Sequence, residues 1–172
     1  AEMTSKALEV LAKEDEGFFL MVEGSKVDWA AHANDPVGVK SDVLAFDEAV
    51  KVAKDFADKN KDTVIVVASD HGTGGLTIGH RDISSGYDKA PLSEFTHIIK
   101  NAKLTGEGVA NKINNDRTNI AAVMEEAYGI TNLTSEELST LKETDNLHGA
   151  VGTIVSNRSH IGWTTGGHVG GD

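Results

Sequence analysis

Two segments of the chain are almost entirely apolar, and a long amphipathic segment lies between them. Residues 18–22 read Phe-Phe-Leu-Met-Val, and residues 63–68 read Thr-Val-Ile-Val-Val-Ala. Short uninterrupted runs of this kind are typical of strands covered on both faces, as in a parallel sheet. Between them, residues 41–59 carry apolar side chains at intervals of three and four, which predicts a helix with Ser41 as its cap. Strand, helix and strand in this order predict a βαβ unit and an α/β fold.

The remaining segments read mainly as short helices. One is expected from Thr4 or Ser5 to about Glu14. Further helices are expected at 91–100, 106–114, 118–128, 134–142 and 147–158, followed by a short strand at 159–164. The capping-box spacing of Thr134 and Glu137 supports one of these helices, and Gly129 stands where a glycine would end another.

The change of pattern along the chain divides it into two parts. Residues 1–90 and 151–172 are expected to form an α/β metal-binding core, with residues 91–150 as a helical insertion. The chain begins without a signal-like segment and ends in a glycine-rich stretch, which suggests a portion of a longer protein.

Composition and charge limit the possible functions. Of the 172 residues, 39% are hydrophobic and 25% are charged, and no apolar run approaches the roughly 20 residues that span a bilayer. Sixteen basic residues stand against 27 acidic ones, a formal net charge of -11, so we do not expect nucleic acid as a specific partner. Cysteine is absent, so any metal site must use His, Asp and Glu.

The first group of candidate ligands follows the first predicted strand, because open parallel sheets place ligands at the carboxyl ends of their strands. Glu23 ends this strand, and Asp28 and His32 would share one face if their segment is helical. A carboxylate and an imidazole can bind one divalent ion together, a ligand set typical of catalytic zinc. An exposed pair on a surface helix would have the same spacing, so both interpretations remain open.

Two further segments have similar character. Asp70 and His71 directly follow the second predicted strand and precede the glycine-rich residues 72–75, which suits a metal or phosphate site. The alternative is that Asp70 caps the turn beside a passive histidine. His168 lies within Gly-Gly-His-Val-Gly-Gly at 166–171, where glycines let the backbone come close to an ion or substrate.

Four other residues are weaker candidates. His160 lies in the same predicted strand and loop as His168, and Trp29 borders Asp28. Lys26 and Arg158 are possible anion contacts, although solvated charges would explain both.

Taken together, the three candidate segments resemble the C-terminal part of alkaline phosphatases. The resemblance rests on Glu-Gly-Ser-x-x-Asp-x-x-x-His at 23–32, on Ser-Asp-His at 69–71 and on Thr-Thr-Gly-Gly-His-x-Gly at 164–170. It runs from about residue 17 to the end, and the helical region looks like the accessory region of bacterial members. The implied fold is a partial version of the family's parallel-sheet α/β sandwich.

The resemblance also implies roles for the candidate ligands. Asp28, His32 and His168 would hold one zinc, the ion that activates the attacking water. Asp70 and His71 would hold a second zinc, which activates the serine nucleophile.

For Glu23, the resemblance implies a magnesium ligand. The implied reaction is hydrolysis of small phosphate monoesters through a phosphoserine intermediate. A homodimer and a periplasmic or extracellular location would also follow from the resemblance.

One departure from the family pattern affects the expected activity. The family's nucleophilic serine stands in an Asp-Ser-Ala context, which does not occur in this chain. We therefore expect the C-terminal portion of a phosphatase, inactive alone, whose N-terminal half supplies the serine, a metal-bridging aspartate and a phosphate-binding arginine.

Two alternatives remain open. One is a non-catalytic metal-binding or interaction fragment, and the other is a different two-metal enzyme, such as a phosphodiesterase or a cofactor-independent phosphoglycerate mutase.

Overall fold

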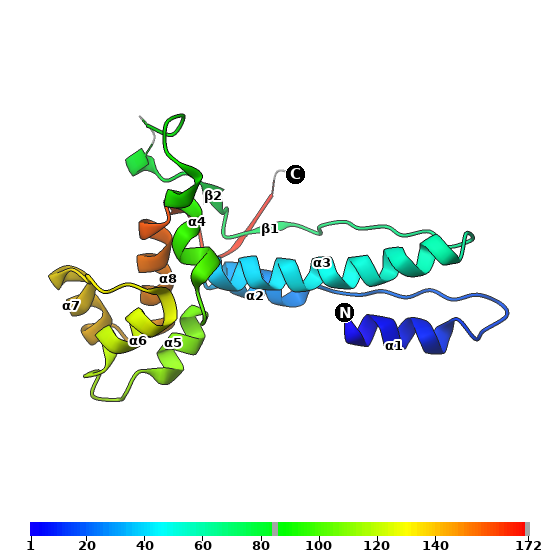
Figure 1. The fold of residues 1–172 in the computed structure, drawn as a ribbon, viewed down its shortest axis with the longest axis horizontal. Coiled ribbons are helices and arrows are strands. Elements are labelled where there is room, and N and C mark those ends of the chain that lie inside the picture. Colours follow the sequence, from blue (N-terminus) through cyan, green and yellow to red (C-terminus); the bar gives the residue numbers. More distant parts are fainter. Residues whose placement is uncertain (84–85, 171–172) are drawn as a thin grey trace.

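The computed structural model describes residues 1–83 and 86–170, in which helices predominate and the strands are short (Figure 1). The helices are α1 (Glu2–Leu11), α2 (Ser25–His32), α3 (Pro36–Lys59), α4 (Leu92–Asn101), α5 (Gly106–Lys112), α6 (Ile120–Tyr128), α7 (Ser135–Glu143) and α8 (Leu147–Arg158). The strands are β1 (Gly72–Thr73), β2 (Thr77–Ile78), β3 (Ile161–Gly162) and β4 (His168–Val169), and η1 (Arg81–Ile83) is a 3-10 turn. Among the described helices, none is long and apolar enough to cross a membrane. Gly171, the last glycine of the expected motif, lies outside the described residues.

The main apolar core lies in the unit formed by helices α4 to α8. Its largest fully buried apolar side chains are Val109, Ile120, Met124, Leu141, Val151 and Val155. The five helices expected from the pattern are confirmed, as are the capping box of Thr134 with Glu137 and the left-handed Gly129, whose φ is 69°. The division into a core and an insertion stays a prediction, and α8 runs across its boundary at residue 150.

The long helix α3 begins earlier than the apolar spacing predicted, because Asp35 caps it. One carboxylate oxygen of Asp35 accepts from the backbone N–H groups of Val37 at 2.9 Å and Gly38 at 3.0 Å. Pro36 occupies the first turn, where its missing N–H costs nothing. The other oxygen accepts from the N–H of Gly106 at 2.7 Å, so this buried carboxylate also fixes the start of α5.

The two apolar runs expected as strands are extended segments that lie along α3; they run parallel to each other and opposite to the direction of α3 (Figure 1). Within the described residues they have no strand partners; the observed sheets are the antiparallel pairs β1–β4 and β2–β3. Side-chain exposure alternates along both runs, with Phe18 at 37% and Ile65 at 38% on the more covered side. The most exposed members are Phe19 (90%), Met21 (74%), Val64 (86%) and Val66 (83%). Each segment therefore has one face on the helices and one open face, the pattern of a strand that lacks its neighbours.

Arg158 is engaged within the helical unit and is not free to bind an anion. Its guanidinium donates to both carboxylate oxygens of Glu137, at 2.8 and 2.7 Å, and also to the side chain and backbone of Asn132. This bidentate pair fastens the end of α8 to the first turn of α7. Hydrogen bonding from Arg158 lowers the pKa of Glu137 to about 2.

The pair predicts a pH-dependent stability. Because the pKa of Glu137 lies below its ordinary 4.5, the pair stabilises the fold above that pH, and the contribution is lost as the pH falls toward 2. Glu137→Gln should lower the free energy of unfolding by about 1–2 kcal/mol near neutral pH, with the difference from wild type shrinking below about pH 4. Urea unfolding at several pH values measures this. Glu136→Gln, which removes an exposed charge from the same turn, is the matched control, and a pH-independent difference for Glu137→Gln would contradict the prediction.

Candidate metal centre

The short helix α2 places Asp28 and His32 one turn apart, as the four-residue spacing predicted. The Asp28 Oδ1 atom lies 3.5 Å from the His32 Nε2 atom. Neither side chain is buried, so both donor atoms are open to a ligand from solvent.

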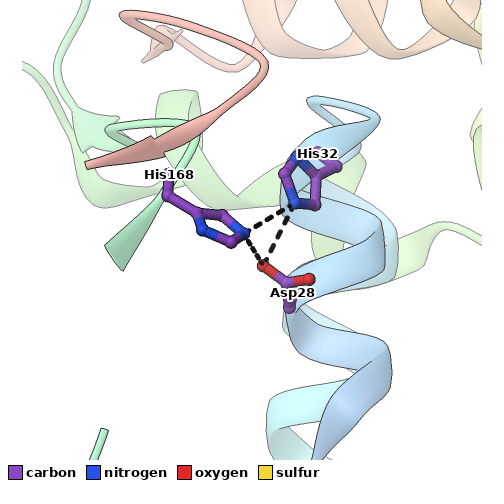
Figure 2. A group of neighbouring side chains, drawn as sticks. All are labelled: Asp28, His32 and His168. Carbon is purple, nitrogen blue, oxygen red and sulfur yellow. Dashed lines mark hydrogen bonds and ion pairs between the residues drawn. The ribbon is translucent and has the colours of Figure 1, made fainter. Parts of the chain in front are cut away.

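His168 reaches the same point from the other end of the chain. It lies on β4, which pairs with β1 so that Thr73 stands opposite His168. The His168 Nε2 atom is 3.1 Å from the His32 Nε2 atom and 3.7 Å from Asp28 Oδ1. Figure 2 shows these three side chains converging from α2 and β4. Within the part of the chain that the structure describes, they form the one group of three such residues close enough to share a metal ion.

Hydrogen bonds hold the glycine-rich loop before His168 against Gly74, which follows β1, and against His32 on α2. Gly74 donates its N–H to the carbonyl of Gly167 and accepts from the N–H of Thr164, both at 2.9 Å. The Nδ1 atom of His32 lies 2.6 Å from the carbonyl oxygen of Gly166. A carbonyl only accepts, so this Nδ1 carries the proton, and in the neutral form of the ring the lone pair of Nε2 is then directed toward Asp28 and His168.

The three donor atoms fit a zinc ion in both chemistry and spacing. Two ligands of a tetrahedral zinc lie about 3.3 Å apart when each is about 2.0–2.1 Å from the metal. The observed separations are 3.1, 3.5 and 3.7 Å. A hydrogen bond from Thr73, supported by the nearby histidines, lowers the pKa of Asp28, so this carboxylate is ionised and suited to a cation.

Asp70 and His71 form a second pair beside this group. Asp70 lies at the end of the second extended segment with its side chain 88% exposed, and its Oδ2 is 3.4 Å from the Nε2 of His71. The His71 ring stacks on the His168 ring, with centroids 3.7 Å apart and an angle of 25° between the planes. The structure thus brings the second sequence motif next to the first and third.

The other sequence candidates are not members of this three-residue group. Glu23 is exposed at the end of the first extended segment, just before the N-cap of α2. His160 has its Nε2 4.0 Å from a carboxylate oxygen of Glu94 and is not part of the three-residue group. Trp29 is exposed, and the ammonium of Lys26 lies 3.5 Å from the centre of its ring, so these two side chains contact each other.

Sequence reasoning missed two contributors to the site. The Thr73 hydroxyl donates to Asp28 Oδ1 at 2.6 Å, and the Gly166 carbonyl orients His32. Their position inside glycine motifs was visible, but no local pattern pairs either with a residue on α2.

With this geometry in hand, comparison with known proteins identifies the family. The family model described as alkaline phosphatase matches residues 1–172. The chain belongs to the alkaline phosphatase family. It is similar to alkaline phosphatase 3 of Bacillus subtilis, with 40% identity across 99% of this chain and 37% of that protein. It is also similar to the repressible alkaline phosphatase of Saccharomyces cerevisiae, with 37% identity across 94% of this chain and 32% of that protein.

The fold agrees with that of a solved alkaline phosphatase. The crystal structure of the cold-active enzyme from Shewanella sp. superimposes with a TM-score of 0.83 and 31% identity, over 99% of this chain and 42% of that one. This likeness confirms the expected fold class, a partial alkaline-phosphatase-like α/β structure. The chain spans less than half the length of each of these phosphatases.

Substitution of Gly74 tests how tightly the turn after β1 packs against α2 and against the loop before His168. Its φ is 76°, and a Cβ there would lie 2.6 Å from the Trp163 ring and 2.9 Å from the Ala31 carbonyl oxygen. Gly129 has a similar φ of 69° with open space around it. Gly129→Ala should therefore cost only about 1 kcal/mol of unfolding free energy, and Gly74→Ala about 1–3 kcal/mol more. Denaturant unfolding of both variants measures the difference, and equal costs would show that the loop does not pack tightly on α2.

Proposed function

We propose that this chain carries the zinc and magnesium ligands of an alkaline phosphatase that hydrolyses small phosphate monoesters through a phosphoserine intermediate. The observation that supports this most is the convergence of one carboxylate and two imidazole nitrogens at 3.1–3.7 Å. Acceptor atoms so close together repel one another unless a cation or a proton lies between them. Family membership supplies the phosphatase chemistry.

In this proposal Asp28, His32 and His168 hold one zinc, and Asp70 with His71 contributes to a second. A divalent ion bound here would supply Lewis-acid stabilisation to the oxygens of a transferring phosphoryl group.

The protein's own part in this chemistry is to hold the metal-ligating atoms of His32, His168 and Asp28 in position. The Gly166 carbonyl keeps the His32 ring in the tautomer that presents Nε2, and pairing of β4 with β1 sets the position of His168. The ionised Asp28 balances positive charge at the site.

For Glu23 we propose a magnesium ligand. Its exposed position before α2 leaves it accessible to groups from elsewhere. We further propose that those groups, together with the serine nucleophile, the bridging aspartate and the phosphate-binding arginine, come from the N-terminal half of an alkaline phosphatase.

The two unpaired extended segments support this view of a partner. Phe19, Met21, Val64 and Val66 present apolar side chains to solvent, and the backbone edges beside them have no strand partner among the described residues. Neighbouring strands of a parallel sheet would pair with these backbone edges, and a covering layer would bury these apolar side chains. Homodimerisation and a periplasmic or extracellular location rest on the family resemblance.

The absence of the Asp-Ser-Ala motif favours a second candidate, a metal-binding chain without catalysis. Zinc binding without hydrolysis in any combination with an N-terminal half would support that alternative. A phosphodiesterase or phosphoglycerate mutase finds no such support, since the family model that matches is alkaline phosphatase.

Zinc binding tests the proposed ligands. His168→Ala removes one of three donors and should weaken zinc affinity by at least about tenfold. His97→Ala, an exposed histidine on α4, should leave the affinity unchanged. Competition with a chelating dye measures both. Equal effects of the two substitutions would contradict the assignment.

Activity tests the need for a second part. With a chromogenic phosphate monoester and added zinc and magnesium, the 172-residue chain alone should turn over about 10³-fold or more below a complete alkaline phosphatase, because it lacks the nucleophile motif. A chelator-treated sample controls for contaminating phosphatase. Metal-dependent turnover within tenfold of a complete enzyme would show that the chain holds a nucleophile of its own.

A further inference from the structure

Thr73 contacts a member of each candidate metal group. Its Oγ1 atom lies 2.6 Å from Oδ1 of Asp28 and 3.2 Å from Nδ1 of His71. Its backbone lies opposite His168 in the β1–β4 pair. One hydroxyl thus stands between Asp28 of the three-residue group and His71 of the second pair.

The chemistry of these atoms fixes the direction of both hydrogen bonds. An ionised carboxylate only accepts, so the hydroxyl proton of Thr73 is directed to Asp28. The threonine oxygen then has only lone pairs left for its second neighbour, so the Nδ1 atom of His71 must carry the proton in that contact. The Gly72 carbonyl, 3.2 Å from the same Nδ1, also requires a donor there.

A protonated Nδ1 determines what the other side of the His71 ring offers. In the neutral ring Nε2 is left with a free lone pair, and this atom lies 3.4 Å from the Oδ2 atom of Asp70. Two acceptors then face each other, an arrangement that a shared cation relieves. The same hydroxyl therefore orients a carboxylate in one group and, together with the Gly72 carbonyl, favours the ligating tautomer in the other.

We propose that Thr73 is a positioning residue shared by both metal groups, accepting from Nδ1–H of His71 and donating to Oδ1 of Asp28. The inference rests on the proposed metal binding for its functional meaning, whereas the tautomer of His71 is a property of the metal-free chain. Loss of the hydroxyl should weaken zinc binding and reduce the preference of the His71 ring for the Nδ1–H tautomer, leaving the Gly72 carbonyl as the remaining acceptor.

The test compares Thr73→Val, which keeps the shape but removes the hydroxyl, with Thr73→Ser, which keeps the hydroxyl. Thr73→Val should bind zinc about tenfold or more weakly, and Thr73→Ser should stay within about threefold of wild type. Thr77→Val, an exposed threonine on β2, is the matched control and should bind zinc as wild type does. Unfolding of the metal-free variants checks that Thr73→Val retains the fold.

Nitrogen-15 NMR of the histidine rings in the metal-free chain, at a pH where they are neutral, supplies the second readout. The His71 ring, assigned from the signals lost in His71→Gln, should be in the Nδ1–H tautomer in wild type and Thr73→Ser, and should show a larger Nε2–H fraction in Thr73→Val. Wild-type zinc affinity in Thr73→Val, equally weak binding by Thr73→Ser, or an unchanged His71 tautomer in Thr73→Val would each overturn the inference. If wild type itself binds no zinc, the proposed function fails, while the tautomer comparison still decides the role of Thr73.

Discussion

The placement of α2, which carries Asp28 and His32, depends on the hydrogen bonds of the buried carboxylate of Asp35. Asp35 lies in the short connection between α2 and α3, starts α3 through two N–H groups and fixes the first residue of α5 through a third. A buried charge without such partners would cost several kcal/mol, so the chain has little freedom to place these helix starts elsewhere. Gly38 allows close approach of α3 to α2, since a Cβ there would lie 2.9 Å from that of Ala30. The helix that carries Asp28 is thereby joined to the helical unit.

Features determined by near neighbours in the chain could be predicted from the sequence. The capping box at Thr134 and the left-handed Gly129 need only a few consecutive residues, and both are present. The apolar spacing predicted a start at Ser41, because the first turns of α3 lie before the periodic apolar positions; the observed start is set by Asp35 as N-cap and Pro36 as first helical residue. The apolar runs are extended, but neither is a paired strand among the described residues, because pairing depends on neighbours that no local pattern reveals.

The same distinction applies to the candidate site. Asp28 and His32 could be placed together because four residues of helix separate them. Gathering His168 into the group required the family resemblance, since its partner His32 is 136 positions away. The contact of Thr73 with Asp28 spans 45 positions and depends on how β1 lies against α2, so neither spacing nor composition indicated it.

The distance in sequence between His32 and His168 has a consequence for how the chain assembles. Their contact closes a loop of 136 positions, so forming it carries a larger loop-closure entropy cost than a contact between near neighbours does. An ion bound by both ends would act as a cross-link that favours the folded state by mass action. Metal availability would then determine how tightly the two ends of this chain stay joined.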